Sequence, residues 1–401
     1  MPTSGIFAWI TWIVASIFYA YQYVLRVMPN IMLDDIMQRF QIDSHVFGQF
    51  SGVYYIGYCL MHLPLGILLD RYGPKRVMPL CILMTAVGAL PIVITDFWMY
   101  PLFGRILTGM GSSAAILGAF KIIRITFPED KFTRMLSLTV TIGLLGAIYG
   151  GGPVAYLCRV FGYETVVMIL VSAGIVLSVI TYFIVPETDA TPTHSFLSDM
   201  MDVLKNGKVL AVCLLSGLMI GPLEGFADVW ASAFLKQVYQ LETTTASSLP
   251  SLIFLGMCFG APLLSLIAEK SRSYLGTIIA SAVIMALSFL GIVVYQIDAI
   301  TLSILFVIIG VCCAYQIIAI YKASTYVSEQ AVSLTTALAN MIIMLFGYVF
   351  HSSIGWTVSS FGGAQSSQAL TYGIVIIPLC LVISALGLIV LAFQEASGRR
   401  S

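Results

Sequence analysis

The chain has 401 residues, of which 59% are hydrophobic and only 9% are charged. Soluble domains carry about 25% charged residues, so this composition excludes an ordinary water-soluble protein and favours one whose surface faces lipid. Nineteen Lys and Arg residues balance nineteen Asp and Glu residues, which excludes the strongly basic surface of a nucleic-acid-binding protein. We therefore expect a membrane protein whose surroundings are the lipid bilayer.

Apolar runs long enough to cross a bilayer recur from the first residues to the last. The first run continues to about Val27 and lacks the basic start and the cleavage site of a signal peptide, so we expect it to remain as a helix. A spanning helix needs about 20 mainly apolar residues, whereas barrel strands alternate polar and apolar residues, so the fold class is all-α. We expect twelve transmembrane helices at residues 5–27, 46–69, 76–95, 98–120, 135–157, 163–185, 209–234, 247–268, 275–296, 300–321, 333–355 and 369–393.

The basic residues predict the orientation. If both termini are cytoplasmic, five of the nineteen basic residues fall on the opposite side or just inside the membrane, namely Arg26, Arg39, Arg105, Arg159 and Lys236. The other fourteen fall on the cytoplasmic side, as the positive-inside rule requires. We therefore expect a multi-pass protein of the cell inner membrane with both termini in the cytoplasm.

The longest polar break lies near the midpoint and predicts two halves. We expect an N-terminal six-helix bundle at 1–185, a cytoplasmic linker at 186–208, and a C-terminal six-helix bundle with a short cytoplasmic tail at 209–401. A weak repeat supports this division, because Asp70-Arg71 corresponds to Glu269-Lys270, and Gly111 to Gly310, both at an offset of 199 residues. Parallel halves of this kind are typical of one large class of transporters.

The turn after the second helix carries the most specific motif. Gly73 allows a positive φ there and Pro74 fixes the next φ, so the chain turns tightly. An ordinary positive-inside loop would explain the basic residues but not the acidic Asp70 at this spacing. This motif closely resembles the signature between helices two and three of the major facilitator superfamily. The resemblance implies a gating role for the motif residues Gly66, Asp70, Arg71, Gly73, Lys75 and Arg76.

Two further segments strengthen the resemblance. Residues 104–111 resemble the Arg-containing motif of the fourth helix, and residues 143–153 resemble the Gly-Pro motif of the fifth. The chain is identified as a member of the superfamily over its full length. The resemblance implies a monomeric transporter that works by alternating access, without cofactor or metal, and not an enzyme. It also implies that Asp70 faces the N-terminus of helix eleven, near Glu329 to Ser333, when the cytoplasmic side is closed, where the helix dipole favours a carboxylate.

Ionisable residues within the spans are the first candidates for the substrate site, because a charge near the bilayer centre costs several kcal/mol. On the first helix a polar face is predicted by the spacing of Tyr19, Gln22, Tyr23 and Arg26. The second helix adds Tyr54 and Tyr58. The alternatives are tyrosines in an interfacial aromatic belt and an arginine that extends to the membrane surface.

The fourth and seventh helices add charges of opposite sign. Arg105 is either a structural anchor or a ligand for a carboxylate. Glu224 and Asp228 are four residues apart beside Gly221 and Pro222, which weaken the helix. Each acid is a candidate for holding a substrate ammonium group, carrying a coupling proton or pairing with Arg105. Neutral hydrogen-bonding candidates on helices ten and eleven are Tyr315, Gln316 and Asn340.

One basic and one acidic centre in opposite halves suit a zwitterion, so we expect a small-molecule substrate such as an amino acid or dipeptide, with symport of protons. The Tyr-rich second helix, which ends at Leu69 to Gly73, resembles a branch that contains the lysosomal dipeptide transporter and bacterial nutrient permeases. Alternatives are an efflux pump for drugs or siderophores, which the Gly-Pro motif favours, and a non-transporting sensor. No catalytic motif or metal-ligand spacing appears in the sequence, and His62 and His351 are isolated.

Overall fold

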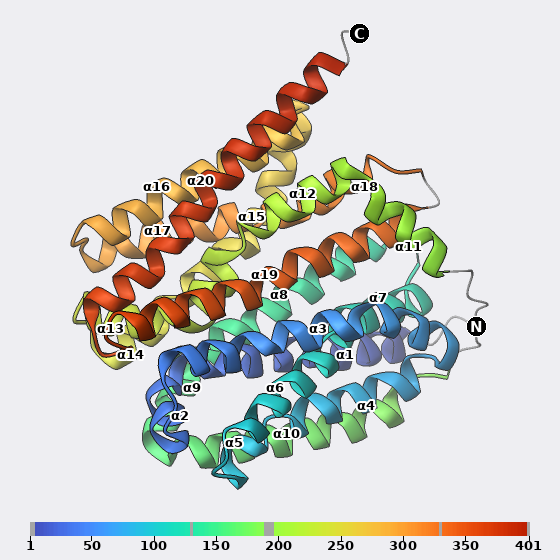
Figure 1. The fold of residues 1–401 in the computed structure, drawn as a ribbon. Helices are drawn as coiled ribbons and strands as arrows, with labels where there is room; N and C mark the ends of the chain where they lie inside the picture. Colours follow the sequence, from blue (N-terminus) through green and yellow to red (C-terminus); the bar gives the residue numbers. More distant parts are fainter. Residues whose placement is uncertain (1–4, 129–130, 188–195, 329–330, 399–401) are drawn as a thin grey trace. The chain divides into compact units, whose positions relative to one another are not determined.

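The computed structural model describes residues 5–128, 131–187, 196–328 and 331–398, and its regular elements within these ranges are helices (Figure 1). The chain divides into two compact units. The N-terminal unit comprises residues 1–43 and 49–194, and the C-terminal unit comprises residues 44–48 and 195–401. The division between them falls inside the segment 186–208, where residues Phe196–Lys205 form a helix, α11.

Twelve helical stretches among the described residues are long and apolar enough to cross a membrane, and each overlaps one of the expected spans. The prediction of an all-α protein with twelve spans is confirmed. Most of the stretches are longer than the apolar runs, as at Gly207–Val238 and Ala299–Ser324. The reason is that a helix continues through the polar boundary of the bilayer, whereas an apolar run marks only its hydrocarbon core.

The N-terminal unit contains six spans, several of which are built from two helices. The short helix α2 lies between the first two spans (Figure 1). The helices are α1 (Gly5–Ile31), α2 (Leu33–Phe40), α3 (Ser44–Tyr72), α4 (Pro74–Val87), α5 (Pro91–Ile94), α6 (Met99–Ser112), α7 (Ala114–Thr126), α8 (Phe132–Gly150), α9 (Gly152–Phe161) and α10 (Tyr163–Ile184).

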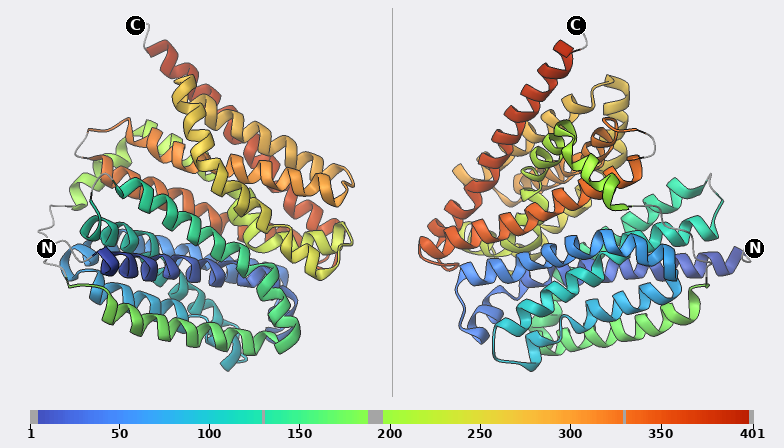
Figure 2. Two further views of the ribbon diagram at one scale, coloured as in Figure 1. Left: turned by 180° about the vertical axis from the view of Figure 1, so that it is seen from behind. Right: turned by 45° about the vertical axis from the view of Figure 1, so that its right-hand side comes forward.

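The C-terminal unit also contains six spans. Its first span, which is the seventh of the chain, consists of three consecutive helices. Its last span is one long helix, α20, drawn in red in Figure 2. The helices are α12 (Gly207–Gly217), η2 (Gly221–Trp230), α13 (Ala231–Val238), α14 (Thr243–Ser248), α15 (Ser251–Ser271), α16 (Tyr274–Val294), α17 (Ala299–Cys313), α18 (Tyr315–Ser324), α19 (Val332–Ser360) and α20 (Ser367–Gly398).

The turn between α3 and α4 has the predicted conformation. Gly73 has a φ of 73°, in the left-handed region, and Pro74 is the first residue of α4. Because a residue with a Cβ atom pays a steric cost at this φ, glycine is the residue that the turn needs. The motif therefore has the local backbone that its sequence implies.

Glycines let the second and fourth spans of each unit cross at close range. In the N-terminal unit, a Cβ atom on Gly57 would overlap the carbonyl of Ile106, and one on Gly109 would overlap the carbonyl of Tyr54. In the C-terminal unit, α15 and α17 cross in the same way, with Gly310 against the carbonyl of Ile253. Small residues at such crossings are a common means of packing helices in a bilayer, where apolar side chains gain little from leaving lipid.

These crossings correct the predicted repeat. By its contact, the counterpart of Gly310 is Gly109, which lies 201 residues earlier, and not Gly111. Gly111 instead faces α4, where an added Cβ would overlap the carbonyl of Cys81. The predicted pairing of Gly111 with Gly310 was wrong because it assumed that one offset holds throughout the two halves. The offset is 199 residues between Gly57 and its equivalent on α15, Gly256, but 201 residues between Gly109 and Gly310. The C-terminal unit thus has two more residues between its second and fourth spans.

Two alanine substitutions in α3 test the close crossing. We expect Gly57→Ala to lower the free energy of unfolding by roughly 1–3 kcal/mol, because the new methyl group meets a backbone carbonyl that cannot move alone. Gly66→Ala is the control, since no atom lies within 4 Å of its added Cβ. Thermal unfolding of both purified proteins in detergent measures the difference, and equal midpoints would contradict the close crossing.

Candidate functional site

The predicted polar face of the first span turns toward the second span. Tyr54 in α3 donates a hydrogen bond from its hydroxyl to Oε1 of Gln22 in α1, at 2.9 Å, and both residues are buried. In α1, the rings of Tyr19 and Tyr23 meet edge to face with centroids 5.3 Å apart. Tyr19 also packs against α8, where a Cβ on Gly143 would overlap its ring. The structure thus brings together two of the candidate residues, Gln22 and Tyr54.

Arg26 lies among aromatic rings one turn further along α1. Its guanidinium carbon is 4.8 Å from the centroid of the Tyr23 ring and 5.5 Å from that of Tyr55 in α3. The residue is 6% exposed. Stacking of this kind stabilises a guanidinium that has been removed from water. This geometry is that of a buried cation and not of an arginine that extends to the membrane surface.

A column of stacked rings continues along α3 from this cluster. Tyr54, Tyr58 and His62 are spaced by four residues, and successive ring centroids are 6.4 and 5.2 Å apart with nearly parallel planes. His62 is 4% exposed. The sequence analysis treated His62 as an isolated histidine, although its spacing of four from Tyr58 places both residues on one helix face.

Arg105 in α6 is engaged with the backbone of α1. Its Nη1 donates to the carbonyl of Leu25 at 2.8 Å, and its Nη2 to the carbonyl of Arg26 at 3.3 Å. In an α-helix the carbonyl of Leu25 would accept from the N–H of residue 29, but residue 29 is proline and has none. Arg105 thus supplies the hydrogen bond that Pro29 removes, and this geometry favours the anchor over the carboxylate ligand.

A double-mutant cycle between Arg105 and Pro29 tests the anchor. Arg105→Leu should destabilise the protein by about 1–3 kcal/mol, because the buried carbonyl of Leu25 loses its donor. Pro29→Ala restores an N–H to the helix, so the same Arg105→Leu change should cost clearly less in that background. Thermal unfolding in detergent measures all four proteins. Additive effects would show that Arg105 does not act through this carbonyl.

In the C-terminal unit, Glu224 and Asp228 lie in a segment of π-helix. The sequence predicted an α-helix weakened by glycine and proline, whereas η2 has hydrogen bonds between residues five apart, such as that from the N–H of Ala231 to the carbonyl of Phe226. Both acids are 1% exposed. Since four residues remain close to one turn, the pair still shares a side of the helix. Segments of π-helix are rare and are found frequently at functional sites.

An aromatic cluster fixes the other side of η2. The ring of Phe226, between the two acids in sequence, lies edge to face with Phe289 of α16 at 5.2 Å and with Phe306 of α17 at 5.7 Å. It also meets Phe234 of α13 at 5.8 Å. The three partners are fully buried. This packing prevents free rotation of the helix that carries the acids.

The neutral candidates of the C-terminal unit differ in their surroundings. Tyr315 is completely buried and donates from its hydroxyl to the carbonyl of Ser216 at 2.7 Å. Gln316 is buried, and its Nε2 has no hydrogen-bond partner among the described residues. Asn340 in α19 is partly exposed. Gln316 therefore has a donor that a ligand would satisfy, whereas the hydroxyl of Tyr315 is already used.

Asp70 of the gating motif has an ion-pair partner in its own unit. Its Oδ1 lies 2.7 Å from Nζ of Lys121 in α7. Lys121 directly follows the expected span 98–120, but the sequence analysis did not pair it with Asp70, since the contact depends on how α3 and α7 pack. The expected contact of Asp70 near Glu329 to Ser333 includes residues outside the described ranges and stays a prediction. Of the basic motif residues, Arg76 pairs with Glu187 at 2.7 Å.

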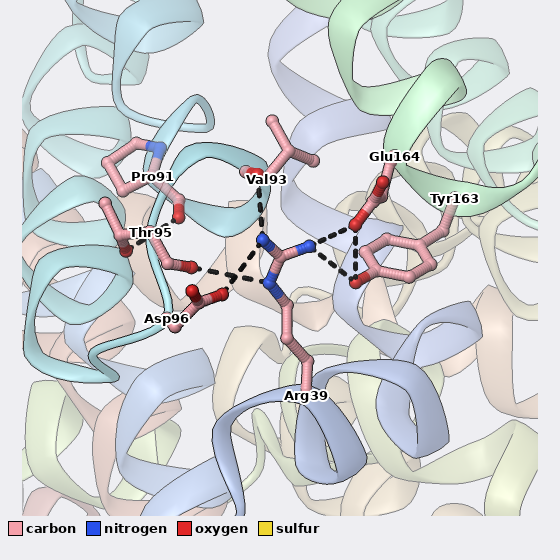
Figure 3. Close-up of polar contacts among 7 residues, drawn as sticks. All are labelled: Arg39, Pro91, Val93, Thr95, Asp96, Tyr163 and Glu164. Atoms are coloured by element: carbon pink, nitrogen blue, oxygen red, sulfur yellow. Dashed lines mark hydrogen bonds and ion pairs between the residues drawn. The ribbon is translucent and has the colours of Figure 1, made fainter.

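A second arginine network joins three connections of the N-terminal unit (Figure 3). Arg39 of α2 donates to the carbonyls of Val93 and Thr95 at 2.9 and 3.3 Å, to Asp96 at 3.3 Å, and to Tyr163 and Glu164 at the start of α10. The hydrogen bond with Tyr163 raises the pKa of Arg39 above its ordinary value. Because all the guanidinium nitrogens are engaged, this arginine ties the loops together and is a structural rather than a binding residue.

Within the described part of the chain, no three His, Cys, Asp or Glu side chains converge as metal ligands would. The eight cysteines are free thiols that are buried or partly buried. The polar groups described above therefore offer hydrogen bonds, charge and aromatic surface, which are means of holding an organic solute.

Comparisons with known proteins agree with this architecture. The model of the Major Facilitator Superfamily matches residues 11–351. The quinolone resistance protein NorB of Staphylococcus aureus (strain MSSA476) is 26% identical over 231 residues, which cover 57% of this chain but only 46% of NorB. The chain thus matches about half the length of that relative. The uncharacterized transporter YybO of Bacillus subtilis (strain 168) is 21% identical over 388 residues, with 88% of each chain covered.

Two solved structures share the fold. A bacterial homolog of the human lysosomal transporter Spinster, in an inward-facing and unoccupied conformation, superposes with a TM-score of 0.79 at 15% identity and covers 96% of this chain and 97% of its own. The D323A mutant of the nucleoside transporter NupG superposes with a TM-score of 0.73 at 15% identity, with 96% and 99% covered. At such identities the likeness shows the fold alone.

Proposed function

This chain belongs to the major facilitator superfamily, and from that premise we propose that it moves a small polar organic solute across the membrane by alternating access. It is a multi-pass membrane transporter and not an enzyme. The observation that carries the proposal is the burial of charged side chains within apolar spans, Arg26 in one unit and Glu224 in the other. Such residues are expensive in a membrane and are retained for function.

A zwitterion such as an amino acid or dipeptide is the solute class that we favour. Of the two buried arginines, Arg26 is the better candidate for the carboxylate, because two donors of Arg105 already bond to carbonyls of α1. Gln22 lies one turn from Arg26 and adds an amide to the same face. In the C-terminal unit, Glu224 offers a negative charge for an ammonium group or for a coupled proton.

A second candidate is export of a planar aromatic compound. It is favoured by the stacked column of Tyr54, Tyr58 and His62, whose rings offer flat surfaces, and by the similarity to a protein named for quinolone resistance. Aromatic side chains bind flat ligands mainly through buried apolar area, whereas a zwitterion depends on charge. The two candidates therefore differ in how they depend on Arg26.

A ligand screen by thermal shift separates the candidates. The purified protein is heated with amino acids, dipeptides, sugars, organic anions and a quinolone, and a bound solute at 100 times its Kd stabilises the fold by about 2.7 kcal/mol. We expect stabilisation by a zwitterion, lost in Arg26→Gln but kept in Arg159→Gln, which changes a less buried arginine of α9. Stabilisation by the quinolone alone, unchanged in Arg26→Gln, would favour export.

Proton coupling is tested at Glu224 with the solute that the screen identifies. Glu224→Gln should abolish accumulation driven by a pH gradient but keep counterflow exchange, because an amide cannot release a proton but fills the same space. Glu242→Gln, which changes an acid outside the spans, is the control. Radiolabelled uptake into proteoliposomes measures both modes. Wild-type accumulation in Glu224→Gln would mean that the proton is carried elsewhere or that the transporter is a uniporter.

A further inference from the structure

The span that carries Glu224 is interrupted just before it, between α12 and η2. There the N–H of Met219 bonds to the carbonyl of Ser216 at 3.0 Å, and the N–H of Ile220 bonds three residues back in the same way. In a continuous α-helix the N–H of Met219 would instead bond to Leu215. The turn therefore removes the usual donor from the carbonyl of Leu215, and the usual donor of Ser216 is replaced by a weaker one.

Two hydroxyl groups from neighbouring helices bond to these carbonyls. Tyr315, the first residue of α18, donates to the carbonyl of Ser216 at 2.7 Å, and Ser384 of α20 donates to the carbonyl of Leu215 at 2.7 Å. Both donors are completely buried. Since a buried carbonyl without a donor is unfavourable, these hydroxyls stabilise the interrupted helix relative to a continuous one.

Glycines on both sides of the interruption pack against phenylalanine rings of α19. A Cβ on Gly217 would overlap the ring of Phe346, and one on Gly221 would lie 2.7 Å from the ring of Phe350. The rings therefore fit only where the two helices have no side chain. This packing is independent of the hydroxyl groups, and it fixes the same turn from a third helix.

We propose that Tyr315 is a positioning residue, whose hydroxyl holds the interruption between α12 and η2 and thereby sets the direction in which Glu224 points. Without this donor, the N–H groups of Met219 and Ile220 are no longer held in bonds three residues back and exchange between these and bonds four residues back. The turn then opens more often, and the residues after it move around the helix axis. This role rests on the proposed function of Glu224, and it replaces direct contact of the Tyr315 hydroxyl with substrate.

Hydrogen–deuterium exchange of the intact protein in detergent provides the first measurement. Tyr315→Phe removes only the hydroxyl, so we expect amides of residues 219–230 to exchange roughly 5- to 10-fold faster, with α1 unchanged. Tyr321→Phe is the matched control on the same helix, because Tyr321 is 49% exposed and packs its ring on Tyr274. Ser384→Ala tests the same turn from α20 if Tyr315→Phe does not fold. Unchanged exchange, or equal acceleration in Tyr321→Phe, overturns the proposal.

The second measurement distinguishes positioning from stability. Dicyclohexylcarbodiimide reacts with protonated carboxyl groups in apolar surroundings, and peptide mass spectrometry locates the label at Glu224 or Asp228. We expect the pH midpoint for labelling of Glu224 to move in Tyr315→Phe and to stay in Tyr321→Phe. If amide exchange becomes faster but the pH midpoint for labelling of Glu224 does not move, Tyr315 has only a structural role and the proposal is overturned. Because neither measurement needs transport, wild-type accumulation in Glu224→Gln would refute the proposed coupling role of Glu224 and leave this result standing.

Discussion

A membrane provides no water for a backbone carbonyl that has lost its helical partner, so each such carbonyl needs a donor from the protein. Pro29 frees the carbonyl of Leu25, and Arg105 bonds to it. The turn before η2 frees the carbonyl of Leu215, and Ser384 bonds to it. In both units the first span, which carries the buried charges Arg26 and Glu224, is thus irregular, and its irregular part is held by side chains from other spans of that unit.

This constraint explains why two buried arginines of the same unit have different roles. Arg105 donates hydrogen bonds to carbonyls of α1, so its charge is used within the protein. These bonds hold the turn of α1 that contains Leu25 and Arg26. Arg26 is in that turn, and its guanidinium is stacked on Tyr23 and Tyr55. Stacking on the faces of rings stabilises a buried cation. Arg105 is therefore held by the backbone of α1, whereas Arg26 is held among rings and stays our candidate for the ligand.

How far the sequence predicted the structure depended on the range of the interaction. The twelve spans and the left-handed Gly73 were predicted correctly, because hydropathy and a turn motif act through residues that are neighbours in the chain. Helical spacing predicted the polar face of α1 that carries Gln22, but the bond from Tyr54 to Gln22 depends on the packing of α3 on α1. The pair of Asp70 and Lys121 was missed because 51 residues separate them and only the packing of α3 on α7 brings them together.

The π-helix could not have been read from the sequence for a related reason. Gly221 and Pro222 indicate that the span is weak at this point, but they are compatible with a kink, a break or an extra residue in the turn. The choice among these depends on Phe346 and Phe350, whose rings occupy the space over the glycines, and on Phe226, which is held by a cluster from three other helices. Local weakness therefore permits the irregular helix, and tertiary packing selects its form. The direction of Glu224 is thus a property of the whole C-terminal unit, which makes it sensitive to any movement of α18, α19 or α20.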